Sequence, residues 1–422
     1  MDNRKTAAWG IGNRKIPLRK KRLTAAVIGA AGESVHAMLS ASSYGIRVVA
    51  LDKNPKAEGL MRADLPLVVD ISDEDAVIAA LRVRGQKPDF VLPVPVGRYL
   101  TTAGAVNDAL GLPGISRDMA VLCTDKFLFH KKLAECRLRR VHCYNVEGTE
   151  LTDAAGGKYC GNRQIEEELP LQFPAILKPR YGSGSRGIHM PGSRKELAEI
   201  LQTLPKEPYV LEECVSGEEY GVDGAVINGR FYMVLLRRKE NTPFPARQAV
   251  AYYSVMREDK AWNRMRAYLK KVTVCLGLQE CLLHADLIDG PKGPFVIELS
   301  ARPSGHNLHD HFTRLCTDVD MVEEYIRHLM GLPCRFAPRK IYPMMIHYFD
   351  MVGKVRSVPT QEQVEEQTGA VVEHWDCRIR KGECLAPVSD GHGLMGRGYF
   401  ILEGEDPAVL HDQAEQIKKM FF

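Results

Sequence analysis

Short apolar runs alternate with helix-forming stretches through the first hundred residues. The run LTAAVIGAA (23–31) precedes a helical stretch (33–44) and a second apolar run, IRVVALD (46–52). LPLVVD, a helix through Arg84 and DFVLPVP (89–95) continue the alternation. Strands that are buried on both faces and separated by helices form parallel sheets, which bind ligands at the carboxyl ends of their strands. The sequence therefore predicts an α/β domain with an open parallel sheet.

The strand pattern changes in the second half of the chain. Residues 208–215, 219–227 and 230–239 are predicted to form consecutive antiparallel strands, with NGR as the hairpin turn between the last two. ECLLHADLID (280–289) and GPFVIELSARP (293–303) are predicted to form a second hairpin. Because the chain of 422 residues exceeds the length over which one hydrophobic core usually grows, we expect two or three domains.

Four other segments have weaker patterns. Residues 118–139 place apolar side chains at helical spacing and are predicted to form one helix, with Lys126 near its start. The polar segment 148–168 is predicted to be an irregular connection, and the residues from Cys334 onward a small α+β domain. A helix is also predicted around residues 262–275, with one apolar face that indicates a core position: Trp262, Met265, Leu269 and Val272.

Charge is concentrated at the N-terminus. The whole chain has a net charge of +4, and residues 1–22 contain eight Lys or Arg against Asp2, which leaves the other 400 residues at 4 − 7 = −3. The body is therefore not predicted to bind nucleic acid. We interpret residues 1–22 as a flexible basic arm, with contact to RNA or an acidic partner as the alternative.

The compartment follows from what the sequence lacks. No apolar run reaches the roughly 18 residues that a membrane span requires, and the first fifteen residues lack the apolar region of a secretory signal. The eleven cysteines form no CxxC pair and are interpreted as reduced, packing thiols. We therefore expect a cytoplasmic protein without a membrane partner.

A glycine-rich loop follows a lysine that ends an apolar strand. In FPAILKPRYGSGSRGI, Lys178 comes directly before the loop, and an ammonium near a core is costly unless an anion meets it. Glycines allow several backbone N–H groups to turn toward one point, which suits phosphate oxygens. The segment therefore predicts a phosphate site.

Acidic residues follow at spacings that suit a nucleotide and a metal ion. In VLEECVSGEEYGVD, the backbone of the first strand can bind a base, and Glu219 can bind ribose hydroxyls. Asp286 and Glu298 can face each other across the second hairpin as hard oxygen ligands for Mg²⁺. Arg302 can stabilise charge on a transferring group.

Together, these five separated elements resemble the ATP-grasp superfamily, in an order that covers nearly the whole chain. The resemblance implies an ATP-grasp fold of mixed α/β and α+β class. It implies a basic arm (1–22), a parallel-sheet pre-ATP-grasp domain (23–120), an ATP-grasp domain of two subdomains that clamp ATP (121–333), and a C-terminal α+β lid domain (334–422).

The resemblance also implies a role for each matching residue. Arg302 and Lys178 would be catalytic. The ATP ligands would be Lys126, Lys178, Ser183, Gly184, Ser185, Gly187, Glu212, Glu213, Val215 and Glu219, with adenine held by the backbone of Glu212 and Val215. The metal ligands for Mg²⁺, or alternatively Mn²⁺, would be Asp286, Glu298 and Ser300. Many members have Asn where this chain has Ser300, whose hydroxyl can still bind the metal ion.

Within the superfamily, residues 369–403 and the segment LRRKENTPFPARQAVAYYSV resemble the L-amino acid ligases, a carboxylate-amine ligase branch. This implies an enzyme that activates a small-molecule carboxylate as an acyl phosphate and transfers it to an amine, on amino acid substrates, with release of ADP and phosphate. The alternative acceptors are a carrier-protein thiol and a purine-type metabolite. A homodimer is a further implication.

Substrate contacts stay open at this level. Arg98 and Arg247 are candidates to bind a substrate carboxylate, and surface positions would explain both equally well. The cluster SGHNLHDHF contains His306, His309 and His311. Its histidines could contact substrate or phosphate, make structural hydrogen bonds, or bind a separate metal ion.

Overall fold

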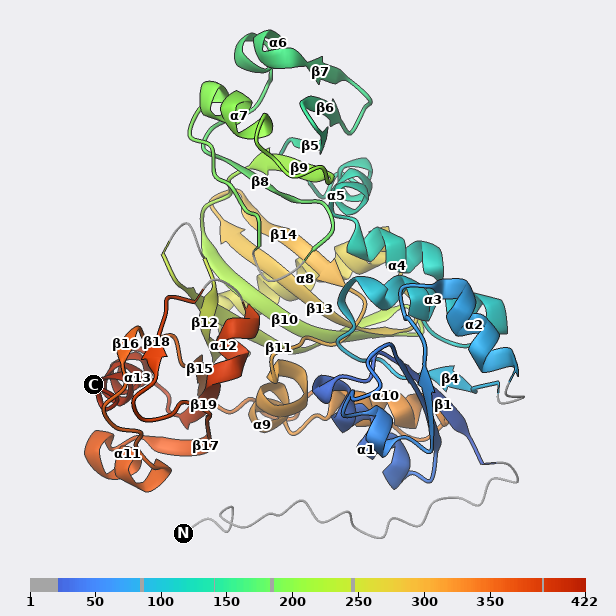
Figure 1. Cartoon of the computed structure of the whole chain (residues 1–422), viewed down its shortest axis with the longest axis vertical. Coiled ribbons are helices and arrows are strands. Elements are labelled where there is room, and N and C mark those ends of the chain that lie inside the picture. Colours follow the sequence, from blue (N-terminus) through green and yellow to red (C-terminus); the bar gives the residue numbers. More distant parts are fainter. Residues whose placement is uncertain (1–21, 84–86, 140, 183–185, 244–246, 389–390) are drawn as a thin grey trace.

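The computed structural model describes residues 22–83, 87–139, 141–182, 186–243, 247–388 and 391–422. Three lobes surround a long central sheet (Figure 1). The upper lobe in that view is built from residues 143–213, the N-terminal lobe lies at the lower right and the C-terminal part at the lower left.

The N-terminal lobe contains the predicted parallel sheet, in the order β3-β2-β1-β4. Its last strand, β4, is two residues long, because Pro93 and Pro95 have no N–H groups with which to continue the ladder. The elements are β1 (Thr24–Ile28), α1 (Val35–Ser43), β2 (Arg47–Asp52), β3 (Leu65–Val68), α2 (Glu74–Val83), β4 (Phe90–Val91) and α3 (Leu100–Leu110). The prediction of an open parallel sheet is confirmed.

The single helix predicted over residues 118–139 is two helices, α4 (Arg117–Thr124) and α5 (Lys126–Glu135). Asp125 separates them with an extended backbone (φ −94°, ψ 103°), and its carboxylate accepts hydrogen bonds from the N–H groups of Phe127 and Leu128, both 3.0 Å. An N-cap of this kind starts a new helix while the apolar spacing continues through it. Lys126 is therefore the first residue of α5.

The upper lobe contains a five-stranded antiparallel sheet in the order β7-β6-β5-β9-β8. Its strands are β5 (Cys143–Glu147), β6 (Glu150–Asp153), β7 (Lys158–Cys160), β8 (Ala175–Pro179) and β9 (Tyr209–Glu213), and its helices are α6 (Gly161–Glu167) and α7 (Arg194–Leu201).

Two predictions in this lobe are wrong. Residues 148–168 form β6, β7 and α6 rather than an irregular connection, and they are short and mostly exposed elements with little apolar periodicity. The strand predicted over 208–215 pairs with β5 and β8, not with the strand that follows it. Sequence adjacency suggested the wrong partner.

The central sheet has eight antiparallel strands in the order β14-β13-β10-β11-β12-β15-β19-β17. Both predicted hairpins are present, and Asn228 (φ 50°) and Gly229 (φ 71°) form the left-handed turn of the first. The first five strands by sequence are β10 (Glu218–Ile227), β11 (Arg230–Asn241), β12 (Ala249–Ser254), β13 (Cys281–Gly290) and β14 (Gly293–Ser300).

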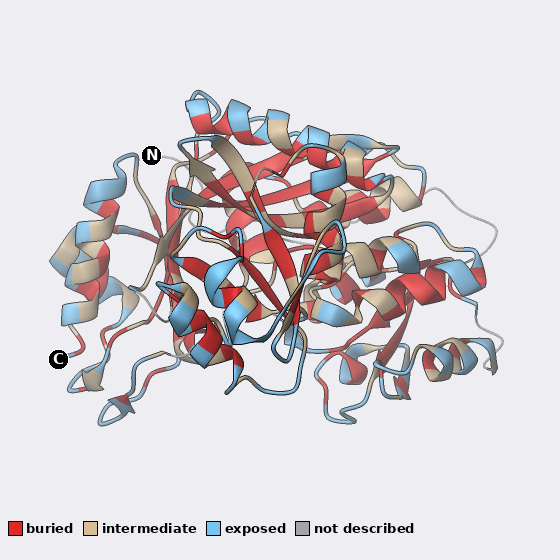
Figure 2. Ribbon diagram, turned by 90° about the horizontal axis from the view of Figure 1, so that it is seen from above, coloured by how far each residue is buried: buried red, intermediate tan, exposed pale blue. Residues whose placement is uncertain are grey.

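One face of this sheet packs against α8 (Lys260–Leu276). The predicted apolar stripe of that helix is buried, and it joins side chains of the sheet in the largest apolar cluster. Figure 2 colours all buried residues red. The other face carries polar side chains. A second cluster joins α1 and the N-terminal sheet to α10 (Met321–Leu329) and to the end of β10, so the N-terminal lobe and the central sheet share a core.

The C-terminal residues have the predicted α+β content, and three of their strands extend the central sheet: β15 (Met344–Tyr348), β17 (Val371–Cys377) and β19 (Gly398–Glu403). Beside them lie α11 (Gln361–Thr368), α12 (Gly391–Arg397), α13 (Pro407–Lys419) and a small pair, β16 (Gly353–Lys354) with β18 (Cys384–Leu385). A π-helix, η4 (Leu308–Phe312), and α9 (Thr313–Thr317) connect the second hairpin to α10.

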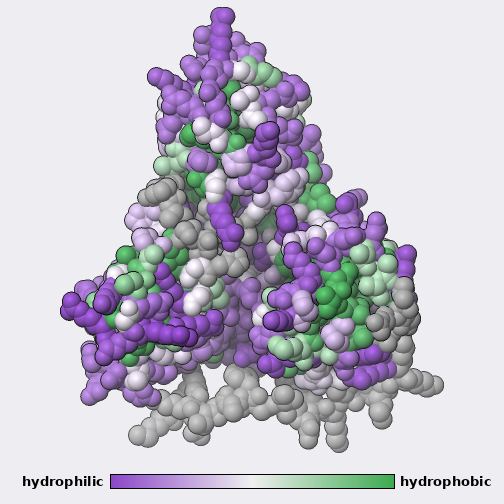
Figure 3. All heavy atoms as spheres, viewed as in Figure 1, coloured by the Kyte–Doolittle hydropathy of each residue, from purple (hydrophilic) through white to green (hydrophobic). Residues whose placement is uncertain are grey.

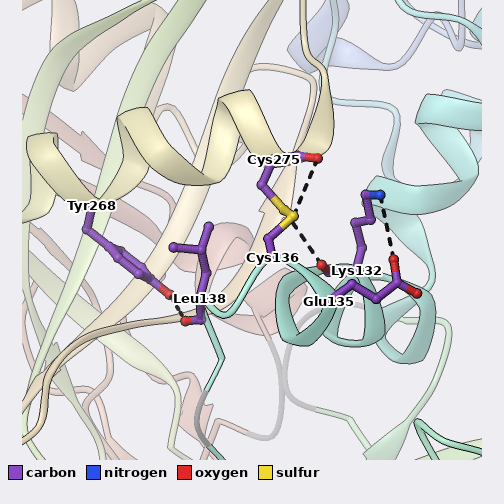
Figure 4. The surroundings of a disulfide bond; sticks show 6 residues. All are labelled: Lys132, Glu135, Cys136, Leu138, Tyr268 and Cys275. Atoms are coloured by element: carbon purple, nitrogen blue, oxygen red, sulfur yellow. Dashed lines mark hydrogen bonds and ion pairs between the residues drawn. A yellow bond between two sulfur atoms is a disulfide. The ribbon is translucent and has the colours of Figure 1, made fainter.

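Cys136, at the end of α5, forms a disulfide with Cys275 of α8 (Figure 4). The interpretation of all the cysteines as reduced is therefore corrected, because the two residues are 139 positions apart and only the fold brings them together. Beside the bridge, the Tyr268 hydroxyl donates to the Leu138 carbonyl at 3.2 Å. The end of α5 is thus held on α8.

On the surface in Figure 3, hydrophilic side chains cover most of the upper lobe, and hydrophobic side chains gather over the N-terminal lobe. In the part of the chain that the structure describes, no helix combines the length and apolar character that crossing a bilayer requires.

Candidate functional site

The face of the central sheet opposite α8 forms a continuous polar surface. Side chains two residues apart along a strand point to the same face, and the strand registers place these residues beside one another. We call this set the polar face: Glu219 and Asp223 of β10, Arg237, Lys239 and Asn241 of β11, His284 and Asp286 of β13, and Glu298 and Ser300 of β14.

The two predicted metal carboxylates are direct neighbours. Asp286 pairs with Glu298 across the β13–β14 hairpin, and Ser300 pairs with His284 one step along. A bulge beside the pair leaves Ile297 as an extra residue on β14. The side chains of directly opposite residues lie about 5 Å apart at Cβ, close enough to share one ion.

Oxygen donors on this hairpin fit Mg²⁺, which is bound by one or two carboxylates and completed by phosphate and water oxygens. The Asp286 carboxylate already has two nitrogen neighbours, the Lys239 ammonium with Nζ at 2.6 Å and the His284 ring with Nε2 at 3.4 Å. Although burial alone would raise the pKa of Asp286, Lys239 lowers it. No group of three or more His, Cys, Asp or Glu side chains suited to a metal ion occurs among the described residues.

Lys178 lies on β8 in a buried ionic cluster with Glu212 of β9. The second Glu212 oxygen accepts from Arg139 at 2.7 Å, and His130 Nε2 lies 3.6 Å from the same oxygen. Burial would raise the pKa of Glu212, but the Lys178 and Arg139 cations lower it far below its ordinary value. His130 Nε2 also lies 3.1 Å from the carbonyl oxygen of Ile297, so the cluster connects the upper lobe to the bulge beside Glu298.

Lys126 projects from the first turn of α5 toward the glycine-rich loop, and its Nζ donates to the Gly182 carbonyl at 2.8 Å. The same end of α5 is tied to the loop by Asp125, which accepts two hydrogen bonds from Arg180 (2.8 and 2.6 Å) and one from the Tyr181 hydroxyl (2.8 Å). Burial lowers the pKa of Lys126, partly offset by Glu298.

The glycine-rich loop is described on either side of residues 183–185. Ser183, Gly184 and Ser185 lie outside the described residues. Gly187 has a positive φ of 65°, and a Cβ there would lie 3.1 Å from the Pro179 ring. The return of the loop onto the end of β8 therefore requires glycine at this position.

The backbone prediction for Glu212 is corrected. Cys214 N–H donates to the Pro174 carbonyl at 3.3 Å, and peptide groups alternate sides along an antiparallel strand. The peptide groups of Glu212 and Cys214 therefore face β8 and are used by the sheet. That of Glu213, the last residue of β9, faces the other way, beyond the first residue of β5. Glu213, with Val215 just beyond the strand, is thus a candidate to bind a base through its backbone.

Glu219 lies at the edge of the polar face, in an ion pair with Arg247 and 2.9 Å from Asn241 Nδ2, which donates to it. The two strand ends and Arg247 enclose a cleft of about 310 Å³ that Gly217, Lys239 and Tyr253 also line. The structure places Arg247 beside Glu219, the carboxylate that is predicted to bind ribose. This position suits a contact with the nucleotide better than the predicted contact with a substrate carboxylate.

Arg302 follows β14 directly, and its Nη1 donates to the Pro303 carbonyl at 2.7 Å. Burial lowers the pKa of the guanidinium, and Glu298, then Glu33, and then Asp286 oppose that effect. Arg302 is therefore near Glu298 and Asp286 of the β13–β14 hairpin and near Glu33 of the N-terminal lobe.

The histidines of the 304–312 segment make different contacts. His306 has a left-handed backbone (φ 61°), its N–H donates to Glu33 at 2.5 Å, and its carbonyl accepts from Tyr348 at 2.5 Å. The ring of His309 is buried with Nδ1 on the Ser304 carbonyl, and His311 Nδ1 lies 2.7 Å from the Tyr399 hydroxyl. His309 and His311 therefore make structural contacts, and the backbone of His306 connects Glu33 of the N-terminal lobe to Tyr348 of the C-terminal part.

Arg98 is not brought to the other predicted residues. It is exposed in η3 (Gly97–Tyr99), with its guanidinium 5.2 Å from the ring of Tyr99. The surface interpretation fits this position.

Several residues of the site were not predicted: Asp125, His130, Arg139, Arg180, Lys239 and His284. Strand alternation could have placed Lys239, because it lies two residues from Arg237 and two from Asn241 on one strand. Arg139 and His130 had no local signal, because their role depends on the packing of α5 against β9 and β14.

Comparisons with known proteins agree with this geometry. Residues 171–309 match the family model of the ATP-grasp domain. Dapdiamide A synthase from Enterobacter agglomerans is 24% identical over 219 residues, which is 48% of each chain. The chain spans about half the length of the curated relatives it matches first, 48% and 55%.

Two solved structures resemble nearly the whole chain. The L-amino acid ligase from Bacillus licheniformis aligns with a TM-score of 0.74 at 15% identity, over 96% of this chain and 98% of that one. N5-carboxyaminoimidazole synthetase from Staphylococcus aureus, complexed with ADP, aligns with a TM-score of 0.69 at 15% identity, over 96% and 99%. The chain therefore contains an ATP-grasp domain over residues 171–309 and has the ATP-grasp fold.

Proposed function

We propose that this protein is an ATP-dependent ligase that joins the carboxylate of one amino acid to the amine of another through an acyl phosphate. One observation carries the proposal: the polar face places Asp286 and Glu298 on one hairpin, and the His130 cluster connects that hairpin to Lys178 in the other lobe. ATP bound between the lobes would have cations on one side and metal ligands on the other.

Each end of ATP has a proposed partner. The backbone of Glu213 and Val215 binds adenine, Glu219 binds ribose, and Lys126 and Lys178 bind the phosphates under the loop that Gly187 closes. Asp286, Glu298 and Ser300 hold Mg²⁺, which supplies positive charge to the phosphate oxygens when it is bound.

The proposed reaction has two steps. A carboxylate oxygen of the first substrate attacks the γ-phosphorus, and the bond to the β-phosphate oxygen breaks to release ADP. The amine nitrogen of the second substrate then attacks the acyl carbon, phosphate leaves with the C–O electron pair, and the nitrogen loses a proton. Arg302 stabilises the oxyanion that forms on the acyl carbon. A glycine-rich loop over the phosphates would exclude water, which otherwise hydrolyses the acyl phosphate.

The amino acid substrates are inferred from the likeness to an L-amino acid ligase and to dapdiamide A synthase. The polar surroundings of Arg302 and His306 also suit a small zwitterion better than a protein-bound thiol. A purine-type acceptor is the alternative, because synthetases of that class have the same fold.

The test is phosphate release from Mg·ATP, screened over amino acids singly and in pairs, with mass spectrometry of the products. We expect release that depends on a pair, together with a new amide mass. Lys178→Ala and Glu298→Ala should each abolish it, whereas Lys195→Ala, an exposed position on α7 of the same lobe, should not. ATP binding without release for any pair would reject amino acid substrates and favour the purine-type acceptor.

A further inference from the structure

One strand, β11, presents three polar side chains at successive positions of the polar face. Arg237 pairs with Asp223, Lys239 with Asp286 and Asn241 with Glu219. The first pair is fully buried, and Thr313 also bonds both partners, Arg237 at 3.0 Å and Asp223 at 2.6 Å. That pair is therefore a closed structural unit. The Lys239 pair differs because its acidic partner is a proposed metal ligand.

Lys239 reaches Asp286 across an intervening strand. Strand β10 lies between β11 and β13, and its residue in register with Asp286 is Gly221. A side chain at Gly221 would begin 3.4 Å from Arg237 Nη2 and 3.6 Å from Lys239 Cε. Glycine therefore leaves the space through which the lysine crosses β10. Its ammonium ends 2.6 Å from Asp286 Oδ1, and the side chain is 9% exposed.

A lysine at this position conflicts with a metal ion. A divalent cation on Asp286 would repel an ammonium on the same carboxylate, and this repulsion is strong where few waters screen it. The Glu298 carboxylate also attracts the Lys239 ammonium. The lysine side chain lies against the Tyr252 ring, with Nζ 5.9 Å from the ring centroid. The ammonium therefore stays within the site when it leaves Asp286, and it needs another anion there.

We propose that Lys239 binds the oxyanion that arrives at the metal pair, and that it neutralises Asp286 until that anion arrives. The ligand is an oxygen anion from one of two sources, the γ-phosphate of ATP or the carboxylate of the first substrate. This inference rests on the proposed function, because it takes Asp286 as a metal ligand. It adds Lys239 to the proposed site as a residue that exchanges Asp286 for the incoming anion.

The charges of the site support this exchange. Without ligands, the carboxylates of Asp223, Asp286 and Glu298 already have cationic partners in Arg237, Lys239 and Arg302, and His284 lies between Asp223 and Asp286. A bound Mg²⁺ adds two positive charges to a buried region, and such a surplus is stable only beside an anion. The metal ion and the oxyanion should therefore bind together, with little metal binding before the nucleotide.

The first experiment measures Mn²⁺ binding to the nucleotide-free protein by electron paramagnetic resonance. Lys239→Met should bind Mn²⁺ about tenfold more tightly than the wild type, because a neighbouring charge changes the affinity of a carboxylate for a cation by about this factor or more. Asp286→Asn should bind it more weakly. Lys270→Met removes an equal charge from the exposed side of α8 and should match the wild type.

The second experiment separates the two sources by calorimetry at saturating Mg²⁺. If the anion is the γ-phosphate, Lys239→Met loses affinity for the β,γ-methylene analogue of ATP and keeps its affinity for ADP. If the anion is the carboxylate, both nucleotides bind as before, and the first amino acid loses affinity in the presence of the analogue. Lys239→Arg keeps the positive charge and should keep most of the affinity.

Unchanged Mn²⁺ and anion affinities in a folded Lys239→Met protein would overturn the inference and leave the proposed function intact. If Asp286→Asn does not weaken Mn²⁺ binding, the proposed metal site is wrong, and the partner exchange is wrong with it. Should Lys239→Met fail to fold because Asp286 is left as an unpaired charge, the double variant with Asp286→Asn restores neutrality, and the calorimetric comparison is made against Asp286→Asn alone.

Discussion

At the scale of single residues, Glu212 has the largest share in arranging the upper half of the site. Its carboxylate is buried between Lys178 and Arg139, so it holds the lysine at the end of β8 and prevents two neighbouring cations from repelling each other. It also ends beside His130, which contacts the Ile297 carbonyl of the β13–β14 hairpin. A residue expected to bind adenine through its backbone instead acts through its side chain.

We therefore expect Glu212→Gln to lower the free energy of unfolding by about 3 kcal/mol, because removing one partner leaves buried cations uncompensated. ATP affinity should fall as well, since Lys178 loses its support. Urea unfolding and calorimetry would measure the two effects. Glu213→Gln changes the neighbouring carboxylate outside this cluster and should leave stability within about 0.5 kcal/mol of the wild type. A stable Glu212→Gln protein would contradict the assignment.

The same residue predicts a pH dependence. The pKa of Glu212 is lower in the folded protein than its ordinary value of 4.5. The carboxylate therefore contributes stability above about pH 4.5, and that contribution is lost as the pH falls toward the folded-state pKa. Unfolding free energies measured from pH 6 down to pH 3 should decrease, and the decrease should be smaller in Glu212→Gln. Equal slopes in both proteins would show that other carboxylates dominate acid unfolding.

At the scale of elements, the start of α5 contains both the N-cap of the helix and a proposed phosphate ligand. Asp125 caps the helix and also holds Arg180 and Tyr181, the residues that begin the glycine-rich loop. The first residue of the helix, Lys126, reaches the same loop. One carboxylate therefore sets both the helix start and the position of a proposed phosphate ligand.

Asp125→Ala should destabilise the protein by about 1 kcal/mol or more through the lost cap, and it should raise the KM for ATP several-fold because the loop loses its anchor. Ser116→Ala is the matched control, since Ser116 caps α4 by accepting from Met119 N–H at 3.2 Å and has no contact with the loop among the described residues. It should show a similar loss of stability with an unchanged KM. Equal KM changes in both variants would refute a specific role for Asp125.

The elements also show what the sequence could and could not predict. The β13–β14 hairpin was predictable because both strands are long and apolar around a tight turn, and hairpin register then forces Asp286 opposite Glu298. Strands β6 and β7 were missed because only Leu151 is fully buried among their residues. The partner of β9 could not be predicted, because nonlocal pairing depends on loop paths that periodicity does not encode.

The disulfide between α5 and α8 makes a further prediction at this scale. Closing a loop of 139 residues reduces the entropy of the unfolded chain, which corresponds to a stabilisation of about 5 kcal/mol in the chain-entropy description. Urea unfolding with and without reductant should show most of this difference, and Cys136→Ser should behave as the reduced protein. Cys384→Ser removes an exposed free thiol and serves as control. No response to reductant in a protein of oxidised mass would contradict the prediction.

At the scale of the whole molecule, the central sheet runs through the boundary predicted at residue 334. Strands β15, β19 and β17 continue it beyond β12, so the C-terminal residues complete a sheet in addition to lying beside the site. Both faces of β12 are buried. Val250 packs in the cluster that contains Met344 and Ile346, whereas Ala251 and Tyr253 pack on the other face with Met345 and Phe400, so both faces depend on residues after 334.

A chain ending at residue 333 should therefore fail to fold as a stable unit, because β12 would become an exposed apolar edge. Expression of residues 22–333, followed by circular dichroism and thermal unfolding, would test this. In contrast, removal of residues 1–21 should leave the proposed ligase activity unchanged, since the described fold begins with Arg22, whose Nε donates to the Gly45 carbonyl at 3.0 Å. A cooperative transition in the truncated chain would show that the C-terminal part is independent.

The bridge between Cys136 and Cys275 also affects how the upper lobe can approach the polar face. Helix α5 is in contact with β5 of that lobe. The C-terminal end of α5, at Cys136, is covalently attached to α8 beneath the central sheet. Sliding of the lobe along the sheet is therefore blocked, and rotation about the bridge is left. The disulfide therefore fixes the point about which the upper lobe can rotate relative to the central sheet.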